Sequence, residues 1–388
     1  MKKNVIVRVL SYILVAAVAS AATLFLAVPL TGNSGSSKLE QLEALIQERF
    51  IADVDETALE DAAAAGMIEA LGDRWSYYIS ADDYQAYKEQ MANAYVGVGI
   101  TIQVREDGTG FDVTKVEAGG PAAEAGILPG DLLVAANGQQ VGALGLEGSS
   151  AIIKGKEGTT VELTVLRDGQ ELTFTVERRL VETAVATAQM MDDKIGLVTI
   201  VNFDSRCAEE TLTAIETLLD QGARALVFDV RFNPGGYKDE LVEILDYLLP
   251  EGDLFLSEEY TGITYVDTSD EEFLDIPMAV LVNSDSYSAA EFFAAALQEY
   301  EAAVIVGEQT SGKGYYQNTF RLSDGSAVGL SVGRYCTPNG VSLEGVGITP
   351  DVAVEVDEQT AAAIYAGTLD PAEDPQVQAA VEALLAAQ

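Results

Sequence analysis

Apolar positions over the second half of the chain follow two alternating patterns. Short, wholly apolar runs such as ALVFDV, MAVLVN and AAVIVGE are separated by longer segments with helical spacing, such as EETLTAIETLLDQG, DELVEILDYLL and AAEFFAAALQEY. Strands that alternate with helices in this way form a largely parallel sheet, buried on both faces and connected by right-handed crossovers. The pattern therefore predicts an α/β domain, which we place at residues 181–357.

Different patterns precede and follow this domain. Between residues 95 and 180, short alternating runs such as GFDVTKV, VELTVLR and ELTFTVERR are separated by Gly-rich turns, which predicts a compact, mostly-β module. Residues 39–94 contain LEQLEALIQERF and ETALEDAAAAGMIEAL, whose apolar positions recur at helical spacing and predict a helical region. Residues 358–388 are acidic and rich in alanine, and we expect them to form a C-terminal tail.

Residues 1–30 have the pattern of a segment that inserts into a membrane. Val9 to Leu30 are uncharged and mostly apolar, and basic residues precede them, which predicts a transmembrane helix with a cytoplasmic N-terminus. ASA at 19–21 resembles the cleavage site of a signal peptide, the alternative interpretation. The apolar run continues past that site and favours an uncleaved anchor, followed by a Gly/Ser linker at 31–38. On either interpretation we expect nearly the whole protein to be extracytoplasmic.

Composition limits the classes of partner and cofactor. The chain has 388 residues with 62 acidic and 22 basic side chains, a net charge of −40, so its surface repels phosphate backbones and we expect no nucleic-acid partner. It contains no histidine, and its cysteines, Cys207 and Cys336, lie far apart and outside any CxxC pattern. A zinc site built from His and Cys is therefore excluded, and we expect neither a metal nor a cofactor. Unpaired thiols are favoured, although the sequence alone leaves a disulfide open.

The segment SYSAAE, residues 286–291, allows two interpretations. In the structural one, Ser288 begins a helix as part of a capping box, and the Glu291 side chain reaches back to the Ser288 amide. In the functional one, Ser288 is a nucleophile on a turn. A nucleophilic serine needs a base, and the chain has no histidine to serve as one.

The loop QTSGKG, residues 309–314, supplies a candidate base in Lys313. A solvated loop lysine is the alternative, because a neutral amine requires its pKa to fall from about 10.4 to near 7, roughly 4 to 5 kcal/mol of desolvation. The glycines on both sides allow the backbone to pack closely around the amine. Gln317 follows shortly after and is a candidate to orient the amine, or else a surface glutamine.

The loop RFNPGG, residues 231–236, is a turn by composition and a candidate oxyanion site by chemistry. Gly235 and Gly236 expose backbone N–H groups, and one of them together with the N–H of Ala289 could stabilise a developing oxyanion. This loop, the serine loop and the lysine loop each follow a predicted strand. Because chemistry in parallel sheets gathers at the carboxyl ends of the strands, we expect the three loops to meet there.

These segments together resemble the carboxyl-terminal processing peptidases, also called tail-specific proteases, over residues 39–357. The matching stretches include ALGDRWSYY, GPAAEAGILPGDLLVAANG, FDVRFNPGG, VNSDSYSAAEFFAAALQEY, VGEQTSGKGYYQ and CTPNGVSLEGVGITPDV. The resemblance implies a serine endopeptidase with a Ser288–Lys313 dyad, assisted by Gln317 and without a cofactor. The lysine follows the serine at the family's spacing. Two positions depart from the family pattern: Ala290 stands where a serine is usual, and Ser311 where phenylalanine is common.

The β module resembles the PDZ domain that this family carries as an insert. YVGVGI would be its carboxylate-binding loop, in which the backbone N–H groups of Val98, Gly99 and Ile100 receive a peptide C-terminus. A Gly-rich hairpin is the alternative interpretation of this loop. Family members often use the PDZ domain to control the protease, and some form homodimers through their terminal helices.

The sequence thus predicts a membrane-anchored serine endopeptidase that cleaves extracytoplasmic proteins at or near flexible C-terminal tails. With no P-loop in the chain, we expect no energy-driven unfolding of substrates. Two other classes compete with this interpretation. One is a non-catalytic PDZ scaffold with a degenerate protease domain, and the other is a Ser-Lys hydrolase of small amides or esters.

Overall fold

The computed structural model describes residues 37–105 and 107–386, in two units that divide between Met67 and Ile68. The first unit contains α2 (Lys38–Arg49) and most of α3 (Glu56–Glu69). A capping box starts α2, because Ser37 Oγ accepts from the Glu40 amide at 3.2 Å and the Glu40 carboxylate accepts from the Ser37 amide at 2.7 Å. Both helices agree with the predicted helical region.

The predicted membrane anchor, Val9–Leu30, lies outside the described residues. Within the described ranges, no helix is both long enough and apolar enough to span a bilayer. The anchor therefore stays a prediction.

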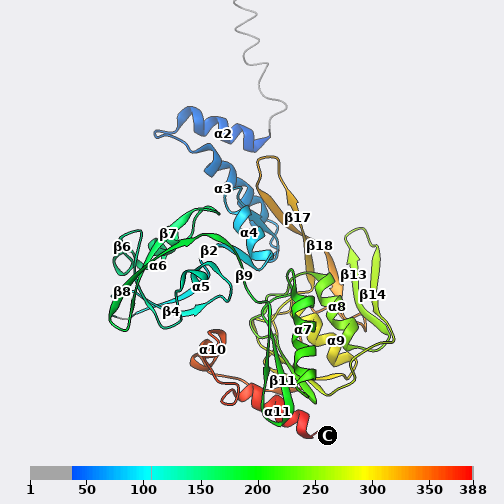
Figure 1. The fold of residues 1–388 in the computed structure, drawn as a ribbon. Coiled ribbons are helices and arrows are strands. Elements are labelled where there is room, and N and C mark those ends of the chain that lie inside the picture. Colours follow the sequence, from blue (N-terminus) through cyan, green and yellow to red (C-terminus); the bar gives the residue numbers. More distant parts are fainter. Residues whose placement is uncertain (1–36, 106, 387–388) are drawn as a thin grey trace, which may run out of the picture. The chain divides into compact units, whose positions relative to one another are not determined.

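The second unit contains a PDZ-like β module and an α/β domain (Figure 1). Its elements begin with β1 (Tyr77–Ile79), α4 (Tyr84–Met91), β2 (Ala94–Gly97), β3 (Ile100–Val104), β4 (Phe111–Val116), α5 (Pro121–Ala125), β5 (Leu132–Ala136), β6 (Gln139–Gln140), α6 (Val141–Ile153), β7 (Thr160–Arg167), β8 (Gln170–Glu177) and β9 (Arg179–Glu182). They continue with β10 (Ala186–Met190), η1 (Asp192–Lys194), β11 (Ile195–Ile200), α7 (Cys207–Asp220), β12 (Ala225–Asp229), α8 (Lys238–Leu248), β13 (Gly252–Glu259), β14 (Thr264–Ser269), β15 (Met278–Val282), α9 (Ala289–Glu299), β16 (Ala303–Gly307), β17 (Tyr315–Arg321), β18 (Ala327–Cys336), β19 (Val352–Ala353), α10 (Glu358–Tyr365) and α11 (Pro375–Ala386).

The β module is a sheet in the order β3-β4-β5-β7-β8, with β6 paired to β5. Its own apolar core includes Phe111, Leu133 and Leu163, all at most 1% exposed. The strands β2 and β9 pair antiparallel with each other where the chain enters and leaves the module. The module therefore closes on a core of its own, as the alternating runs predict.

The α/β domain is built on a sheet in the order β10-β11-β12-β15-β16-β19, parallel except for β10. Alternate residues of each central strand face opposite sides: Val280 joins the core that includes α7, α8 and α9, whereas Ala279 and Leu281 join the core that includes α11. Burial on both faces explains why these strands are apolar throughout. The predicted parallel sheet with crossover helices is confirmed.

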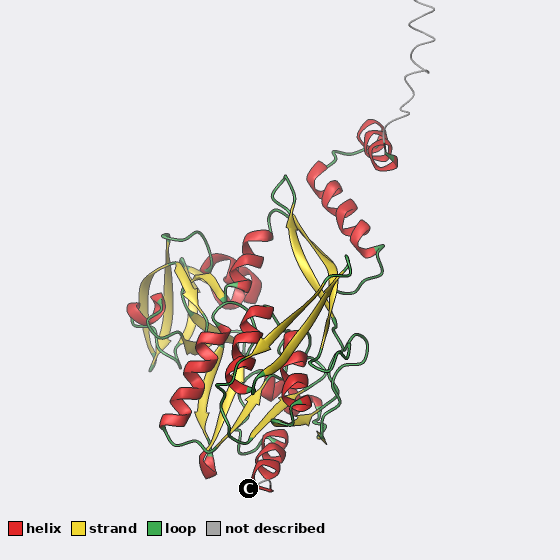
Figure 2. Ribbon diagram, turned by 90° about the vertical axis from the view of Figure 1, so that its right-hand side faces the viewer, coloured by secondary structure: helices red, strands yellow, loops and turns green. Residues whose placement is uncertain are grey.

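A second, antiparallel sheet was not predicted. It has the order β1-β18-β13-β14, and β17 pairs with β18 as a long hairpin (Figure 2). The strand β1 lies inside the predicted helical region 39–94 but pairs with β18, with Tyr77 opposite Gly329. Such pairing joins residues far apart in the sequence, and local spacing carries no signal for it.

The segment predicted as a C-terminal tail contains α10 and α11. Val377, Ala380 and Leu384 of α11 are buried against the sheet at helical spacing. Asp374, just before α11, forms an ion pair with the buried Arg231 at 2.8 Å. The high alanine content conceals this apolar stripe, so the α/β domain continues past the predicted boundary at residue 357.

Candidate active site

The three loops predicted to meet do meet, at the carboxyl ends of the adjacent parallel strands β12, β15 and β16. Asn283 Oδ1 accepts from the Phe232 amide at 2.9 Å, which links the serine loop to the glycine loop. The Ser311 amide donates to the Ser286 carbonyl at 3.2 Å, which links the lysine loop to the serine loop. The sheet order therefore brings Ser288, Lys313 and the two glycines to one edge.

Ser288 stands at the start of α9 with an unusual backbone. Its φ of 58° and ψ of −126° belong to a region that residues with side chains rarely adopt. Gly235 packs against it so closely that an added Cβ would lie 2.7 Å from Ser288 Cβ. Only glycine fits at 235, because a side chain there would collide with the turn that carries Ser288.

Glu291 connects the serine to the lysine, which the sequence did not predict. Its side chain is fully buried, and its Oε2 accepts both from the Ser288 amide at 3.0 Å and from the Lys313 amide at 2.8 Å. Its Oε1 accepts from the Gly312 amide and the Thr310 hydroxyl. The capping box gave the bond to Ser288, but the other bonds come from a loop distant in sequence. One carboxylate thus fixes the backbones of both residues.

The Lys313 amine lies in a partly dehydrated site. Burial lowers the pKa of Lys313 below its ordinary value, against Asp73, Glu344 and Glu291, which act to raise it. Arg74 adds to the lowering. The loop packs tightly against the backbone at Glu344: a Cβ added to Gly314 would lie only 2.6 Å from the Glu344 amide nitrogen. These contacts supply the close backbone packing expected from the flanking glycines.

The structure narrows the choice of oxyanion donor. The Gly235 amide donates to Asn233 Oδ1 at 2.8 Å and is already engaged, which favours the Gly236 amide, together with that of Ala289, as the donors to the oxyanion.

Gln317 has other partners in the structure. Its side-chain nitrogen donates to the Tyr315 carbonyl at 3.1 Å and to Ser331 Oγ at 3.0 Å. Its role in orienting Lys313 stays a prediction.

The predicted carboxylate-binding loop of the β module lies between β2 and β3. Gly99 in this loop has a φ of 76°, a conformation that favours glycine. In the described sheet β3 stands at the end of the strand order, paired with β4 alone. An edge strand preceded by such a loop has the geometry that accepts an added peptide strand, as the prediction for Val98, Gly99 and Ile100 requires.

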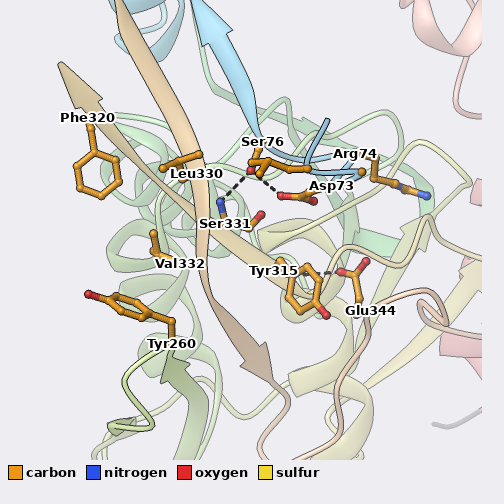
Figure 3. Close-up of a pocket in the computed structure, with 12 residues that line it drawn as sticks. Asp73, Arg74, Ser76, Tyr260, Tyr315, Phe320, Leu330, Ser331, Val332 and Glu344 are labelled. Carbon is orange, nitrogen blue, oxygen red and sulfur yellow. Dashed lines mark hydrogen bonds between the residues drawn. The ribbon is translucent and has the colours of Figure 1, made fainter. Parts of the chain in front are cut away.

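A cavity of about 830 Å³ adjoins the lysine loop (Figure 3). Its lining is apolar on one side and polar on the other, and includes Leu71, Gly72, Asp73, Arg74, Ser76, Tyr260, Tyr315, Phe320, Leu330, Ser331, Val332 and Glu344. Glu344 Oε2 accepts from the Gly314 amide at 2.7 Å and the Tyr315 amide at 3.2 Å, so the cavity wall begins next to Lys313. This volume lies within the range of about 300 to 1,000 Å³ that is usual for ligand pockets.

Asp204 lies behind the glycine loop, and its protonation should make the stability of the protein depend on pH. It is 3% exposed, its Oδ1 has no hydrogen-bond partner among the described residues, and burial with Glu240 nearby raises its pKa to about 7. Because its folded-state pKa exceeds the unfolded value, the folded state loses stability as pH rises from about 4 to about 7. We expect Asp204→Asn to remove this part of the pH dependence, up to about 4 kcal/mol.

Urea unfolding of both proteins at pH 5 and pH 8 measures the effect. The free energy of unfolding should fall between these two pH values by less in the variant than in the wild type. Equal decreases in the two proteins would contradict the assignment.

Comparison with known proteins finds matches along most of the chain. Residues 194–354 match peptidase family S41, residues 96–177 match a PDZ domain, and residues 22–83 match the N-terminal domain of the activating protease CtpB. The chain is 32% identical over 362 residues to carboxy-terminal processing protease CtpA of Bacillus subtilis (strain 168), covering 89% of this chain and 76% of that protein. A CtpA-like serine protease of Staphylococcus aureus (strain COL) is 30% identical, over 84% of this chain and 66% of that protein.

A solved structure shows the same fold. An S41 protease from Bacteroides fragilis NCTC 9343 superposes with a TM-score of 0.56 at 16% identity, covering 90% of this chain and 97% of that one. The identity and coverage of the Bacillus relative, together with the matched domains, assign the family. The chain belongs to peptidase family S41, as a carboxy-terminal processing serine protease with a PDZ domain.

Proposed function

We propose that Ser288 is the nucleophile and Lys313 the general base of an endopeptidase. The observation that carries this proposal is the shared oxygen of Glu291, which holds the amides of Ser288 and Lys313 at 3.0 and 2.8 Å. A single acceptor fixes the two residues relative to each other, and the lowered pKa of Lys313 makes a neutral amine accessible.

The chemistry follows from these positions. The neutral amine of Lys313 takes the hydroxyl proton while Ser288 Oγ forms a bond to the carbonyl carbon of the peptide. The resulting oxyanion accepts hydrogen bonds from the amides of Ala289 and Gly236, and Gln317 orients the amine. When the C–N bond breaks, the Lys313 ammonium returns the proton to the leaving amine. Water then attacks the acyl carbon while Lys313 accepts a proton from it. The bond between that carbon and Ser288 Oγ breaks, the Lys313 ammonium returns the proton to Oγ, and the new C-terminus is released.

We further propose that substrates are flexible C-terminal tails of extracytoplasmic proteins. The loop at Val98–Ile100 and the open edge of β3 support capture of a free C-terminus. The cavity beside the lysine loop supports a bulky apolar side chain near the scissile bond. The apolar segment at residues 9–30 supports anchoring in the cell membrane, with the bulk of the chain outside the cytoplasm, and a homodimer remains an expectation from the family.

The test uses the full chain with an unfolded protein that has either a free or an amidated C-terminus. A serine-directed phosphonate, followed by peptide mass analysis, reports which serine is acylated. We expect cleavage of the free-tailed protein, slower cleavage of the amidated one, and labelling at Ser288. Binding of tails without cleavage or labelling would identify a scaffold instead. Turnover of small esters without cleavage of the protein would identify a small-molecule hydrolase.

Localisation has a separate test. Mass analysis of the protein from the membrane fraction should return an intact N-terminus and the full mass of the chain. A mature N-terminus after residue 21 would replace the anchor with a cleaved signal peptide.

The pH dependence of cleavage tests the base. Only the neutral amine accepts a proton, so kcat/KM should rise with pH and level off above the pKa of Lys313. Because burial lowers that pKa, the plateau should begin below the value of about 10.4 for an ordinary lysine. Rates measured between about pH 5 and 10 report the midpoint. A flat profile across this range would contradict a lysine base.

A further inference from the structure

Trp75 covers the amine of Lys313 from outside the α/β domain. The centroid of its ring lies 4.9 Å from Lys313 Nζ, and the ring of Tyr287 lies 5.7 Å from the same nitrogen. The two rings stack on each other, with centroids 5.9 Å apart and planes at 28°. Tyr287 directly precedes Ser288, so Trp75 touches the surroundings of both proposed catalytic residues.

The position of Trp75 is fixed by Glu344, which lies beside the lysine loop, and by Arg74, which contacts that loop. Its Nε1 donates to Glu344 Oε1 at 3.3 Å, while the other oxygen of Glu344 accepts from the Gly314 amide at 2.7 Å. Arg74 lies over the Trp75 ring at 3.9 Å and donates to Ser311 Oγ at 3.1 Å. The segment before β1 is therefore linked to the lysine loop directly at Ser311 and, through Glu344, at Gly314.

We propose that Trp75 is a positioning residue that keeps water away from the Lys313 amine, so that the segment before β1 completes the active site. The inference rests on the proposed dyad and adds a residue whose side chain contacts the Lys313 amine, Tyr287 and Glu344. The close-up of the neighbouring cavity shows Asp73, Arg74 and Glu344 among its lining residues (Figure 3). The same three residues influence the pKa of Lys313.

Two effects of the ring oppose each other. Its face attracts an ammonium, whereas its bulk removes water and favours the neutral amine. The groups facing the amine are Asp73, Arg74, Tyr287, Glu291 and Glu344, and the three carboxylates favour the charged form. Burial nevertheless dominates and lowers the pKa of Lys313. Losing the ring admits water beside these carboxylates. The ammonium form of Lys313 should then become more stable relative to the neutral amine, and the pKa of Lys313 should rise.

The first test compares the pH profile of kcat/KM for Trp75→Ala, Trp75→Leu and wild type, with Phe273→Ala as a control for losing an exposed aromatic side chain. We expect the alanine variant to shift the rising limb up by about one pH unit, which lowers kcat/KM about tenfold on the limb and little on the plateau. The leucine variant keeps apolar bulk without an aromatic face and should stay near wild type. Thermal unfolding of each variant confirms folding.

A shift to lower pH in both variants would show that the ring acts as a cation–π partner and would overturn the proposal. A loss of activity at all pH values without a shift in the limb would do so as well. If the wild type neither cleaves protein nor is labelled at Ser288, the proposed function fails instead, and the second test then decides the inference alone.

The second test needs no activity, because Trp75 is the only tryptophan of the chain. Its emission in the full-length Ser288→Ala variant is recorded from about pH 6 to 11, with and without the added change Lys313→Met. We expect a transition with a midpoint below that of an ordinary lysine, present with Lys313 and abolished by Lys313→Met. An unchanged transition after Lys313→Met would show that the ring does not respond to the amine, and would overturn the proposal.

Discussion

Replacing either Ser288 or Lys313 by alanine is expected to abolish cleavage of an unfolded protein, with a fall in kcat of roughly 10⁴-fold or more. Without the Ser288 hydroxyl no acyl-enzyme forms. Without the Lys313 amine, the proposed base that accepts the hydroxyl proton is missing. Because the two residues act as a unit, the double variant should be little worse than either single variant. Cleavage is measured by separating substrate fragments over time at saturating enzyme.

Matched controls lie in the same structure. Ser284 is exposed in the same loop as Ser288, and Lys156 is an exposed lysine of the β module, so alanine at either position should leave cleavage unchanged. Thermal unfolding close to wild type in the Ser288 variant separates lost chemistry from lost folding. Undiminished cleavage in either dyad variant would refute the assignment of that residue.

The sequence predicts those parts of the fold that leave a pattern among neighbouring residues. The strands of the parallel sheet are buried on both faces, so each appears in the sequence as an apolar run, and each is followed or preceded by a helical segment. The antiparallel sheet has no comparable signal, since β1 pairs with β18, which is far away in the chain, and both strands contain half-buried residues. The helix α11 was not predicted, because alanines make up much of its sequence and weaken the apolar pattern of its buried face.

The sequence also predicts which loops form the site, but not the contacts between them. Loop positions after parallel strands placed Ser288, Lys313 and the two glycines together, because the carboxyl ends of neighbouring strands share one edge. What the sequence could not supply is the set of contacts among the loops. The bonds of Glu291 to the lysine loop and the position of Trp75 over the amine both join residues that are distant in the chain.

Glu291 carries the second large expected effect. Glu291→Ala leaves the amides of Ser288, Gly312 and Lys313 and the hydroxyl of Thr310 without their acceptor. An unpaired buried donor costs about 1 to 3 kcal/mol, so this variant should be several kcal/mol less stable and inactive. Its inactivity alone would not distinguish a role in positioning the dyad from a general need for folding.

Glu291→Gln makes that distinction. The amide keeps the shape and one acceptor oxygen but turns an NH₂ toward one pair of donors, so either Ser288 and Lys313 or the Gly312 amide loses its bond. We expect a kcat about 10²-fold lower, with KM nearly unchanged and a fold that survives, since a misplacement of about 1 Å is costly for chemistry and minor for packing. Glu308→Gln is the matched control, because the Glu308 side chain, just after β16, accepts from the Val356 amide at 3.3 Å and is not an acceptor for Ser288 or Lys313. A Glu291→Gln enzyme with wild-type kcat would show that positioning the dyad does not need both carboxylate oxygens as acceptors.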